Sequence, residues 1–232
     1  MTNATGMSIH IGLNHVNPAN YNGWDGALGG CIPDAKDMQA LATAQGLNSR
    51  LLTDSEATST AVLDALKKAA TELQSGDYFL ITYSGHGGQV RDNTGEEDDQ
   101  MDETWVLWDR QLIDDELNLA WSWFQSGVNI LMLSDSCHSG TVTRVARNGM
   151  LEPVPLKNTR RAPREVCEEN YLANEAMYID VKNTARIRGP INCSVLLISG
   201  CQDNQYSYDT GSNGVFTNRV KAVWNNGGFQ GD

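Results

Sequence analysis

Two hydrophobic periods alternate along this chain. Short, nearly continuous apolar runs are typical of strands buried on both faces, and they predict strands at residues 8–13, 49–53, 78–83, 105–108, 128–133 and 195–199. Apolar positions three or four residues apart predict helices at residues 34–45, 59–73, 115–124 and 215–224. This order of elements predicts an α/β fold in which helices cover both faces of a mostly parallel sheet.

Two segments interrupt the alternation. Residues 92–103 read DNTGEEDDQMDE and form a predicted acidic loop, while residues 141–190 form a long insertion with little clear periodicity. A run of that length without regular structure is usually functional or disordered in a compact domain. There is no internal repeat, and 232 residues suit one domain, so we expect residues 1–232 to fold as a single unit.

Composition restricts the partners. The formal net charge of −12 would repel nucleic acid and anionic membranes, and it would attract a cationic substrate. The sequence lacks the roughly 18 consecutive apolar residues of a membrane span, and its start does not resemble a secretory signal. Five scattered cysteines without a Cys-x-x-Cys pair indicate reduced thiols. We therefore expect a cytoplasmic protein without a membrane span or a nucleic-acid partner.

Two predicted strands end abruptly at a chemically reactive residue. Residues 78–90 read YFLITYSGHGGQV and place His86 between glycines, while residues 129–141 read NILMLSDSCHSGT and place Cys137 at the corresponding break. Ligands of open α/β sheets bind beyond the carboxyl ends of the strands. If the two strands are neighbours, an imidazole and a thiol share one crevice and can form a nucleophile with its base.

Other interpretations of each residue remain open. A glycine-flanked histidine is often only a tight turn, and a buried cysteine is often inert packing. A cysteine-based phosphatase is excluded, because Thr143 stands where its phosphate-binding arginine is needed and Arg144 comes one place late. The ligand spacing of a zinc site is also absent from the sequence.

Five blocks of the sequence carry a resemblance to a known family. They are GCIPDAKDM, YSGHGGQ, DSCHSG, LISGCQDNQYSYD and GVFTNRV, in that order between residue 30 and about residue 220. The chain resembles the caspase-like cysteine peptidases, specifically metacaspases and their prokaryotic relatives, the orthocaspases. The resemblance implies a caspase-like fold and a cysteine endopeptidase. It divides the chain into a p20-like region of about residues 1–140, a linker of about 141–190 and a p10-like region of about 191–232.

The same resemblance assigns roles to residues. It implies a catalytic dyad of His86 and Cys137, and an oxyanion hole made by the backbone N–H groups of Gly87 and Cys137. It also implies that Asp34 and Asp135 line the primary substrate pocket (S1). Two carboxylates in a narrow pocket favour a guanidinium or an ammonium, so cleavage after arginine or lysine is expected. Alternatively, Asp34 caps the first helix and Asp135 is a turn residue at a strand end. No third member of a catalytic triad is evident.

Calcium is the one cofactor that the resemblance suggests. Asp102, Asp114 and Asp115 match a family calcium site, but Arg144 replaces a further carboxylate. Calcium takes several hard oxygen ligands, and an arginine removes one and adds repulsion. We therefore expect no cofactor to be required and calcium to change the rate little. Asp114 and Asp115 also suit a helix N-terminus.

The insertion at residues 141–190 suggests self-cleavage. It follows the proposed nucleophile directly and is therefore tethered near the site at high effective concentration. We expect its NTRRAPRE run to be the most exposed stretch. Pro163 disfavours the bond after Ala162, which leaves Arg160 and Arg161 as candidate cleavage positions. Alternatively, these arginines form a solvated face that offsets an acidic surface.

Three functions compete at this point. An active endopeptidase is favoured, because a silent relative need not keep both dyad residues. The alternative is a catalytically silent module that binds basic peptides as a scaffold or regulator, and a calcium-responsive binding module is a third. The family continues beyond the helix at 215–224 with further strand sequence, so we expect a truncated chain, an additional domain or a partner chain.

Overall fold

A computed structural model of the chain describes residues 5–91, 101–136, 144–147, 150–153, 159–200 and 211–228. Residue Cys137 lies outside these ranges, as do most of the predicted acidic loop and residues 201–210.

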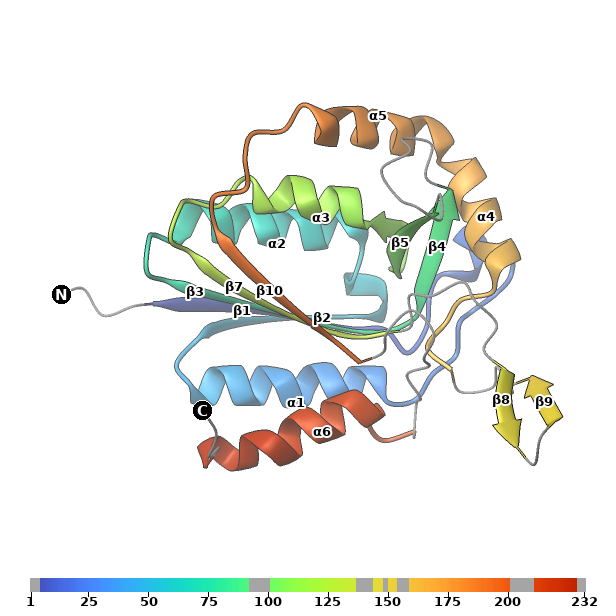
Figure 1. Cartoon of the computed structure of the whole chain (residues 1–232), viewed down its shortest axis with the longest axis horizontal. Helices are drawn as coiled ribbons and strands as arrows, with labels where there is room; N and C mark the ends of the chain where they lie inside the picture. Colours follow the sequence, from blue (N-terminus) through green and yellow to red (C-terminus); the bar gives the residue numbers. More distant parts are fainter. Residues whose placement is uncertain are drawn as a thin grey trace.

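A five-stranded parallel sheet forms the centre of the molecule (Figure 1). Its strands follow the order β10-β7-β3-β1-β2, and every neighbouring pair is parallel. Their bounds are β1 (Gly6–Gly12), β2 (Asn48–Thr53), β3 (Tyr78–Ser84), β7 (Asn129–Asp135) and β10 (Ser194–Ser199). The predicted parallel sheet is confirmed, and each of its predicted strands lies within two residues of the observed bounds.

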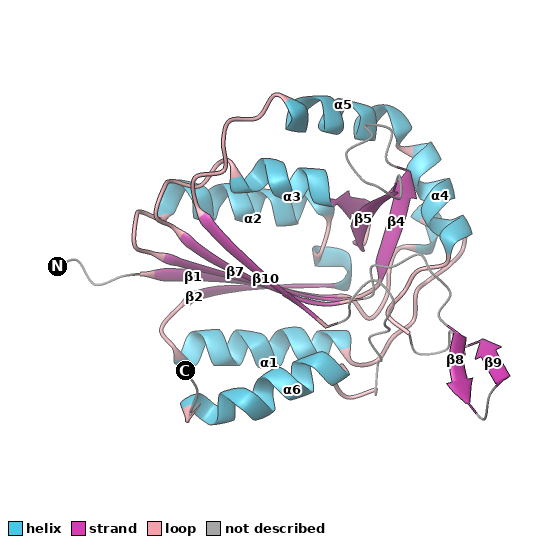
Figure 2. Ribbon diagram, viewed as in Figure 1, coloured by secondary structure: helices cyan, strands magenta, loops and turns pink. Residues whose placement is uncertain are grey.

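Helices cover both faces of this sheet (Figure 2). α1 (Cys31–Ala44) and α6 (Val215–Trp224) lie on one face, and α2 (Ser59–Glu72) and α3 (Asp114–Trp121) lie on the other. α1 begins three residues earlier than predicted, because the side-chain oxygen of Asn14 accepts the N–H groups of Cys31 and Ile32 at 3.0 and 3.1 Å. Asp34 therefore does not cap this helix. Short 3₁₀ turns are η1 (Pro18–Asn20), η2 (Asp54–Glu56) and η3 (Asn225–Gly227).

A small antiparallel sheet lies beyond the carboxyl ends of the parallel strands. It contains β4 (Gly87–Arg91), β5 (Met101–Val106) and β6 (Gln111–Ile113) in that order. The strand predicted at residues 105–108 is thus displaced, and the end of the predicted acidic loop belongs to β5. Tyr83 and Trp105 stack with their ring centroids 4.5 Å apart, which joins the two sheets.

The long insertion contains regular structure, although its sequence shows little clear hydrophobic periodicity. It holds a hairpin of β8 (Arg144–Arg147) and β9 (Met150–Pro153), followed by α4 (Arg164–Ala173) and α5 (Glu175–Arg186). The buried faces of the two helices mix polar and apolar side chains, as Asn170 on α4 and Lys182 on α5 show. A hydrophobic period alone does not detect such faces.

Most apolar side chains of the central strands and of α2 and α3 form one core. β10 is an edge strand, and Leu196, Leu197 and Ile198 on it are exposed. Over the residues that the structure describes, none of the helices is both long and apolar enough to cross a membrane.

Candidate active site

The two strands that end at the candidate dyad are neighbours. β3 and β7 pair in parallel, with Ser84 opposite Asp135 at their carboxyl ends. His86 follows two residues after Ser84, and Cys137 follows two residues after Asp135 in the sequence. The neighbouring arrangement on which the predicted dyad depends is therefore confirmed, although the thiol itself lies outside the described residues.

His86 is buried and oriented by the main chain. Its Nε2 lies 3.0 Å from the carbonyl oxygen of Gly26, and its ring lies 4.8 Å from that of Trp24. A carbonyl oxygen can only accept, so this hydrogen bond requires the proton on Nε2 and leaves Nδ1 as the basic nitrogen. The Gly26 carbonyl was missed in the sequence analysis, since a main-chain oxygen leaves no side-chain signal. Gly26 has φ +61°, a conformation that favours glycine.

Gly87, the predicted oxyanion-hole residue, is paired with the insertion. Its N–H donates to the carbonyl oxygen of Arg160 at 2.9 Å, and its own carbonyl accepts the N–H of Ala162 at 2.8 Å. These two bonds form a short parallel bridge between Gly87 and Arg161. The main chain on both sides of the Arg160–Arg161 bond is thus held against Gly87.

The predicted S1 carboxylates converge on one side chain. Asp34 on α1 and Asp135 at the end of β7 are both buried, and between them lies the guanidinium of Arg160. Arg160 Nη2 lies 2.7 Å from Asp34 Oδ2, and Nη1 lies 2.9 Å from Asp135 Oδ2. Nη1 also donates to Ser84 Oγ at 2.7 Å. This arrangement is a pocket that binds an arginine through a fork of charge-assisted hydrogen bonds.

Residues around α6 hold the two carboxylates in place. The N–H of Gly214 and the side-chain amide of Asn213 donate to Asp34 at 3.0 and 2.8 Å. The N–H and hydroxyl of Thr217 donate to Asp135 Oδ2 at 3.1 and 2.9 Å. The segment at residues 213–217 therefore completes the pocket, a contribution for which the sequence pattern gave no signal.

The charges in the pocket partly balance. Burial raises the pKa of Asp34, and the guanidinium of Arg160 opposes that shift. Burial alone would lower the pKa of Arg160, but nearby groups that include Cys31 and both carboxylates shift it upward, so Arg160 stays charged. Two carboxylates face one guanidinium, so the carboxylates carry one negative charge more than Arg160 neutralises.

The expectation that the NTRRAPRE run is exposed is wrong for Thr159, Arg160 and Ala162, whereas Arg164 and Glu165 are exposed. Arg160 is fully buried, and Arg161 is half-buried against Gly87. The reason is the buried acidic pair of Asp34 and Asp135, whose carboxylates hold the guanidinium of Arg160 through charge-assisted hydrogen bonds. The structure brings Arg160, Gly87, Asp34 and Asp135 into one site.

The candidate calcium residues lie elsewhere, next to the small sheet. Asp102 on β5 is buried and forms an ion pair with Lys182 of α5. Asp114 and Asp115 are the first two residues of α3, and Asp114 Oδ1 accepts the N–H of Asp115 at 3.0 Å. Over the described part of the chain, no group of three or more His, Cys, Asp or Glu side chains is placed to hold a metal ion. With an ammonium against Asp102, these residues do not fit a divalent cation.

Comparison with known proteins agrees with this geometry. The caspase domain family matches residues 15–231. Metacaspase-1 of Schizosaccharomyces pombe is 31% identical over 90% of this chain and 56% of its own length, and Metacaspase-1 of Saccharomyces cerevisiae is 33% identical over 58% of this chain and 33% of its own. The chain thus spans about half or less of these relatives.

A crystal structure of a Geobacter sulfurreducens protein superposes with a TM-score of 0.84 at 41% identity, and the match covers 98% of this chain and 84% of that one. Because the family match runs through almost the whole chain and the parallel sheet has its expected form, this chain belongs to the caspase-domain family, with metacaspases among its relatives.

Proposed function

We propose that this chain is a cysteine endopeptidase that cleaves after arginine, and after lysine less well, and that its first substrate is its own Arg160–Arg161 bond. One observation carries the proposal. The side chain of Arg160 occupies the acidic pocket while its carbonyl oxygen accepts the N–H of Gly87. A substrate residue on the acyl side of a scissile bond needs both contacts at once.

The chemistry follows from these positions. His86 Nδ1 takes the proton of the Cys137 thiol, and the thiolate attacks the carbonyl carbon of Arg160. The N–H groups of Gly87 and Cys137 stabilise the oxyanion as it forms. The protonated imidazole then gives its proton to the nitrogen of Arg161, the peptide bond breaks and a thioester remains. Water, activated by His86, hydrolyses that thioester and restores the thiol.

The pairing with Gly87 favours one bond over its neighbours. Arg160 contributes both the pocket side chain and the carbonyl at the Gly87 N–H, whereas the Arg161 carbonyl lies one residue farther along the bridge. Ala162, held by the Gly87 carbonyl, keeps the leaving side of the bond in place. The cut is therefore expected after Arg160 and not after Arg161.

The pocket also favours arginine over lysine. Nη1 and Nη2 of Arg160 reach separate acceptors, namely Asp135, Ser84 and Asp34. A lysine ammonium is a compact point charge and cannot reach both carboxylates with the same planar fork. While Arg160 fills the pocket, a second substrate is excluded, so the uncut chain is expected to be inactive on peptides.

A silent module that binds basic peptides would hold an arginine in the same pocket. The two functions are separated by intact mass spectrometry of the purified wild type and of the Cys137→Ala, His86→Ala, Arg160→Ala and Arg161→Ala variants. We expect wild type and Arg161→Ala to be cut after residue 160, and the other three to stay uncut there. An intact wild-type chain that does not hydrolyse peptides ending in Arg or Lys would support the silent module and contradict the enzyme.

A matched glycine pair tests the pocket by the rate of peptide hydrolysis. A Cβ on Gly214 would lie 2.2 Å from Asp135 Oδ2 and 2.6 Å from Arg160 Nη1, whereas one on Gly189 would meet no atom within 4 Å. Gly214→Ala should lower kcat/KM on arginine peptides at least about 30-fold, the equivalent of losing ~2 kcal/mol from a buried charge pair. Gly189→Ala should match the wild type, and equal rates in both variants would contradict the pocket assignment.

A further inference from the structure

Lys182 is a buried lysine outside the proposed active site. Its side chain is 3% exposed, although it belongs to α5 on the outside of the molecule (Figure 1). Its Nζ contacts Asp102, donates to the carbonyl oxygen of Arg91 at 2.8 Å and lies 5.8 Å from the centre of the Tyr171 ring. A lysine is almost never this buried unless its charge is paired.

The groups around the Lys182 ammonium are of the kinds that surround a bound metal cation. A carboxylate and a backbone carbonyl are the oxygen ligands that calcium takes in proteins, and a ring face also attracts positive charge. In the small sheet Asp102 pairs with Val90, and Val90 is followed by Arg91, whose carbonyl oxygen also contacts Lys182. Asp102 is itself only 5% exposed, so without a cation beside it the sheet would bury a negative charge.

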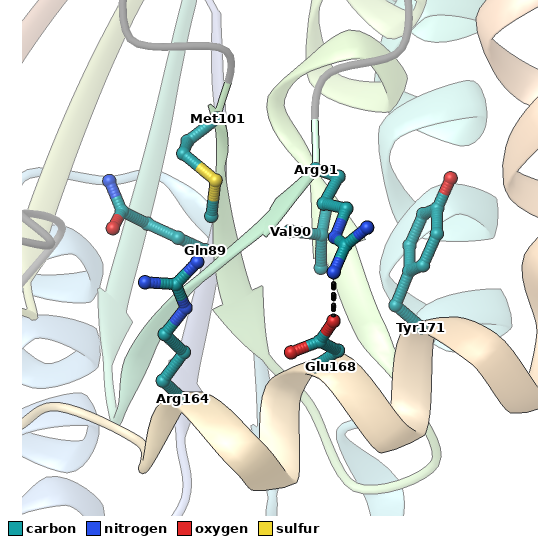
Figure 3. Close-up of a pocket in the computed structure, with 7 residues that line it drawn as sticks. All are labelled: Gln89, Val90, Arg91, Met101, Arg164, Glu168 and Tyr171. Atoms are coloured by element: carbon teal, nitrogen blue, oxygen red, sulfur yellow. Dashed lines mark hydrogen bonds and ion pairs between the residues drawn. The ribbon is translucent and has the colours of Figure 1, made fainter.

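The contact also fixes the position of the two insertion helices. Tyr171, whose ring faces the ammonium, belongs to α4 and stacks on Tyr178 of α5 with ring centroids 5.1 Å apart. Figure 3 shows Arg164, Glu168 and Tyr171 projecting from α4 towards β4, where Arg91 and Glu168 form an ion pair. Asp102 and Lys182 thus join α5, α4 and the small sheet at one buried point.

We infer that Lys182 is the resident cation of the Asp102 site. The tethered ammonium takes the position that a calcium ion would need, so the junction of β4, β5 and α5 forms without a metal. A divalent ion would have to displace a charge that is covalently held beside the carboxylate at high effective concentration. The inference concerns stability and metal binding, and it does not depend on the proposed peptidase activity.

The test uses thermal unfolding of the uncut Cys137→Ala chain with calcium or with a chelator. We expect no calcium-dependent change in Tm and no saturable binding of calcium by calorimetry. Adding Lys182→Met keeps most of the apolar stem but removes the charge, and it should lower Tm by about 6–15 °C because the buried carboxylate of Asp102 loses the ammonium beside it. Adding Asp102→Asn to Lys182→Met should recover most of that loss. Lys68→Met is the control, since the Lys68 side chain is 61% exposed in its pair with Glu72, and it should leave Tm unchanged.

Three results would overturn the inference. They are saturable calcium binding that raises Tm and is lost with Asp102→Asn, a Lys182→Met variant that melts with the parent, and a double variant no more stable than Lys182→Met. If Lys182→Met fails to fold, the double variant Lys182→Met with Asp102→Asn decides between the outcomes. A double variant that folds and does not respond to calcium supports Lys182 as the resident cation. A double variant that also fails to fold contradicts it.

Discussion

At the level of single residues, some buried ionisable side chains have charged partners and others have neutral partners. Asp34 and Asp135 are buried as part of a charged cluster, and the arginine between them is the reason that they tolerate burial. His10, in the middle of β1, is buried with neutral partners: its Nδ1 lies 2.9 Å from Thr82 Oγ1 and its Nε2 lies 2.9 Å from Ser8 Oγ. The first kind prepares a binding site, and the second makes the fold sensitive to pH.

His10 predicts a loss of stability in acid. Burial lowers its pKa from 6.5 to about 4, so the unfolded chain takes up the proton first as the pH falls. The stability that neutral His10 contributes is therefore fully present above pH 6.5 and is lost as the pH falls towards 4. Over this range the free energy of unfolding should fall by about 3 kcal/mol. Urea unfolding of the Cys137→Ala chain across this range measures it.

The matched variants are His10→Gln and His15→Gln. Glutamine at position 10 keeps hydrogen-bonding groups but cannot titrate, so its free energy of unfolding should depend less on pH across this window. The side chain of His15 is 50% exposed, and His15→Gln should keep the wild-type profile. Identical pH profiles for all three proteins would show that another group controls the acid transition.

At the level of elements, α4 of the insertion packs closely on β4. A Cβ on Gly88 of β4 would lie 2.7 Å from Cys167 Sγ and 2.8 Å from Gln111 Oε1. Cys167 is buried by this contact, and burial raises the pKa of its thiol to about 12. The residues after Arg160 are thus held near Gly87 by a helix that depends on one glycine for its position.

Gly88→Ala should separate α4 from β4 and make Cys167 reactive. In the wild type the thiol is expected to resist iodoacetamide at neutral pH, because it is both protonated and covered. In the variant its modification, followed by peptide mass spectrometry, should be at least about tenfold faster. The half-buried Cys193 serves as the internal reference. Unchanged labelling of Cys167 relative to Cys193 would mean that α4 tolerates the added methyl group.

At the level of the whole molecule, the chain segments before and after the proposed cleavage bond form one fold. β10 and α6 follow Arg161 in the chain, yet β10 pairs with β7 along six residues and α6 lies beside α1 on the same face of the sheet (Figure 1). The pocket that holds the Arg160 side chain likewise needs Gly214 and Thr217 from the later part and Asp34 from the earlier part. Cleavage would therefore not divide the molecule into two independent folds.

We predict that the two fragments stay together after the cut. Size-exclusion chromatography of the cleaved wild type should give one peak at the elution volume of uncut Cys137→Ala, and the fragments should separate only in denaturant. The physical reason is the shared sheet, whose hydrogen bonds and apolar contacts are unaffected by one broken peptide bond in the insertion. Two native peaks from cleaved protein would contradict this arrangement.

Local sequence patterns determined much of this protein. Apolar runs and helical periods act over neighbouring residues, so they were sufficient to predict the parallel sheet and the helices at residues 59–73 and 215–224. The breaks at His86 and Cys137 were recognisable for the same reason, since a reactive residue at a strand end is a local feature. The acidic pair Asp34 and Asp135 could be read as a pocket only through the resemblance.

Only the tertiary structure decided what fills that pocket. Asp34 and Arg160 lie 126 residues apart in the chain and meet because the insertion folds back over the ends of the strands. The Gly26 carbonyl beside His86 and the contact of Lys182 with Asp102 also join residues that are far apart in the chain. Hydrophobic periodicity indicates which side of a helix or strand is buried, but the residue that packs against that side depends on long-range contacts. Some partners are main-chain atoms, which are the same in every residue and therefore give no signal in the sequence.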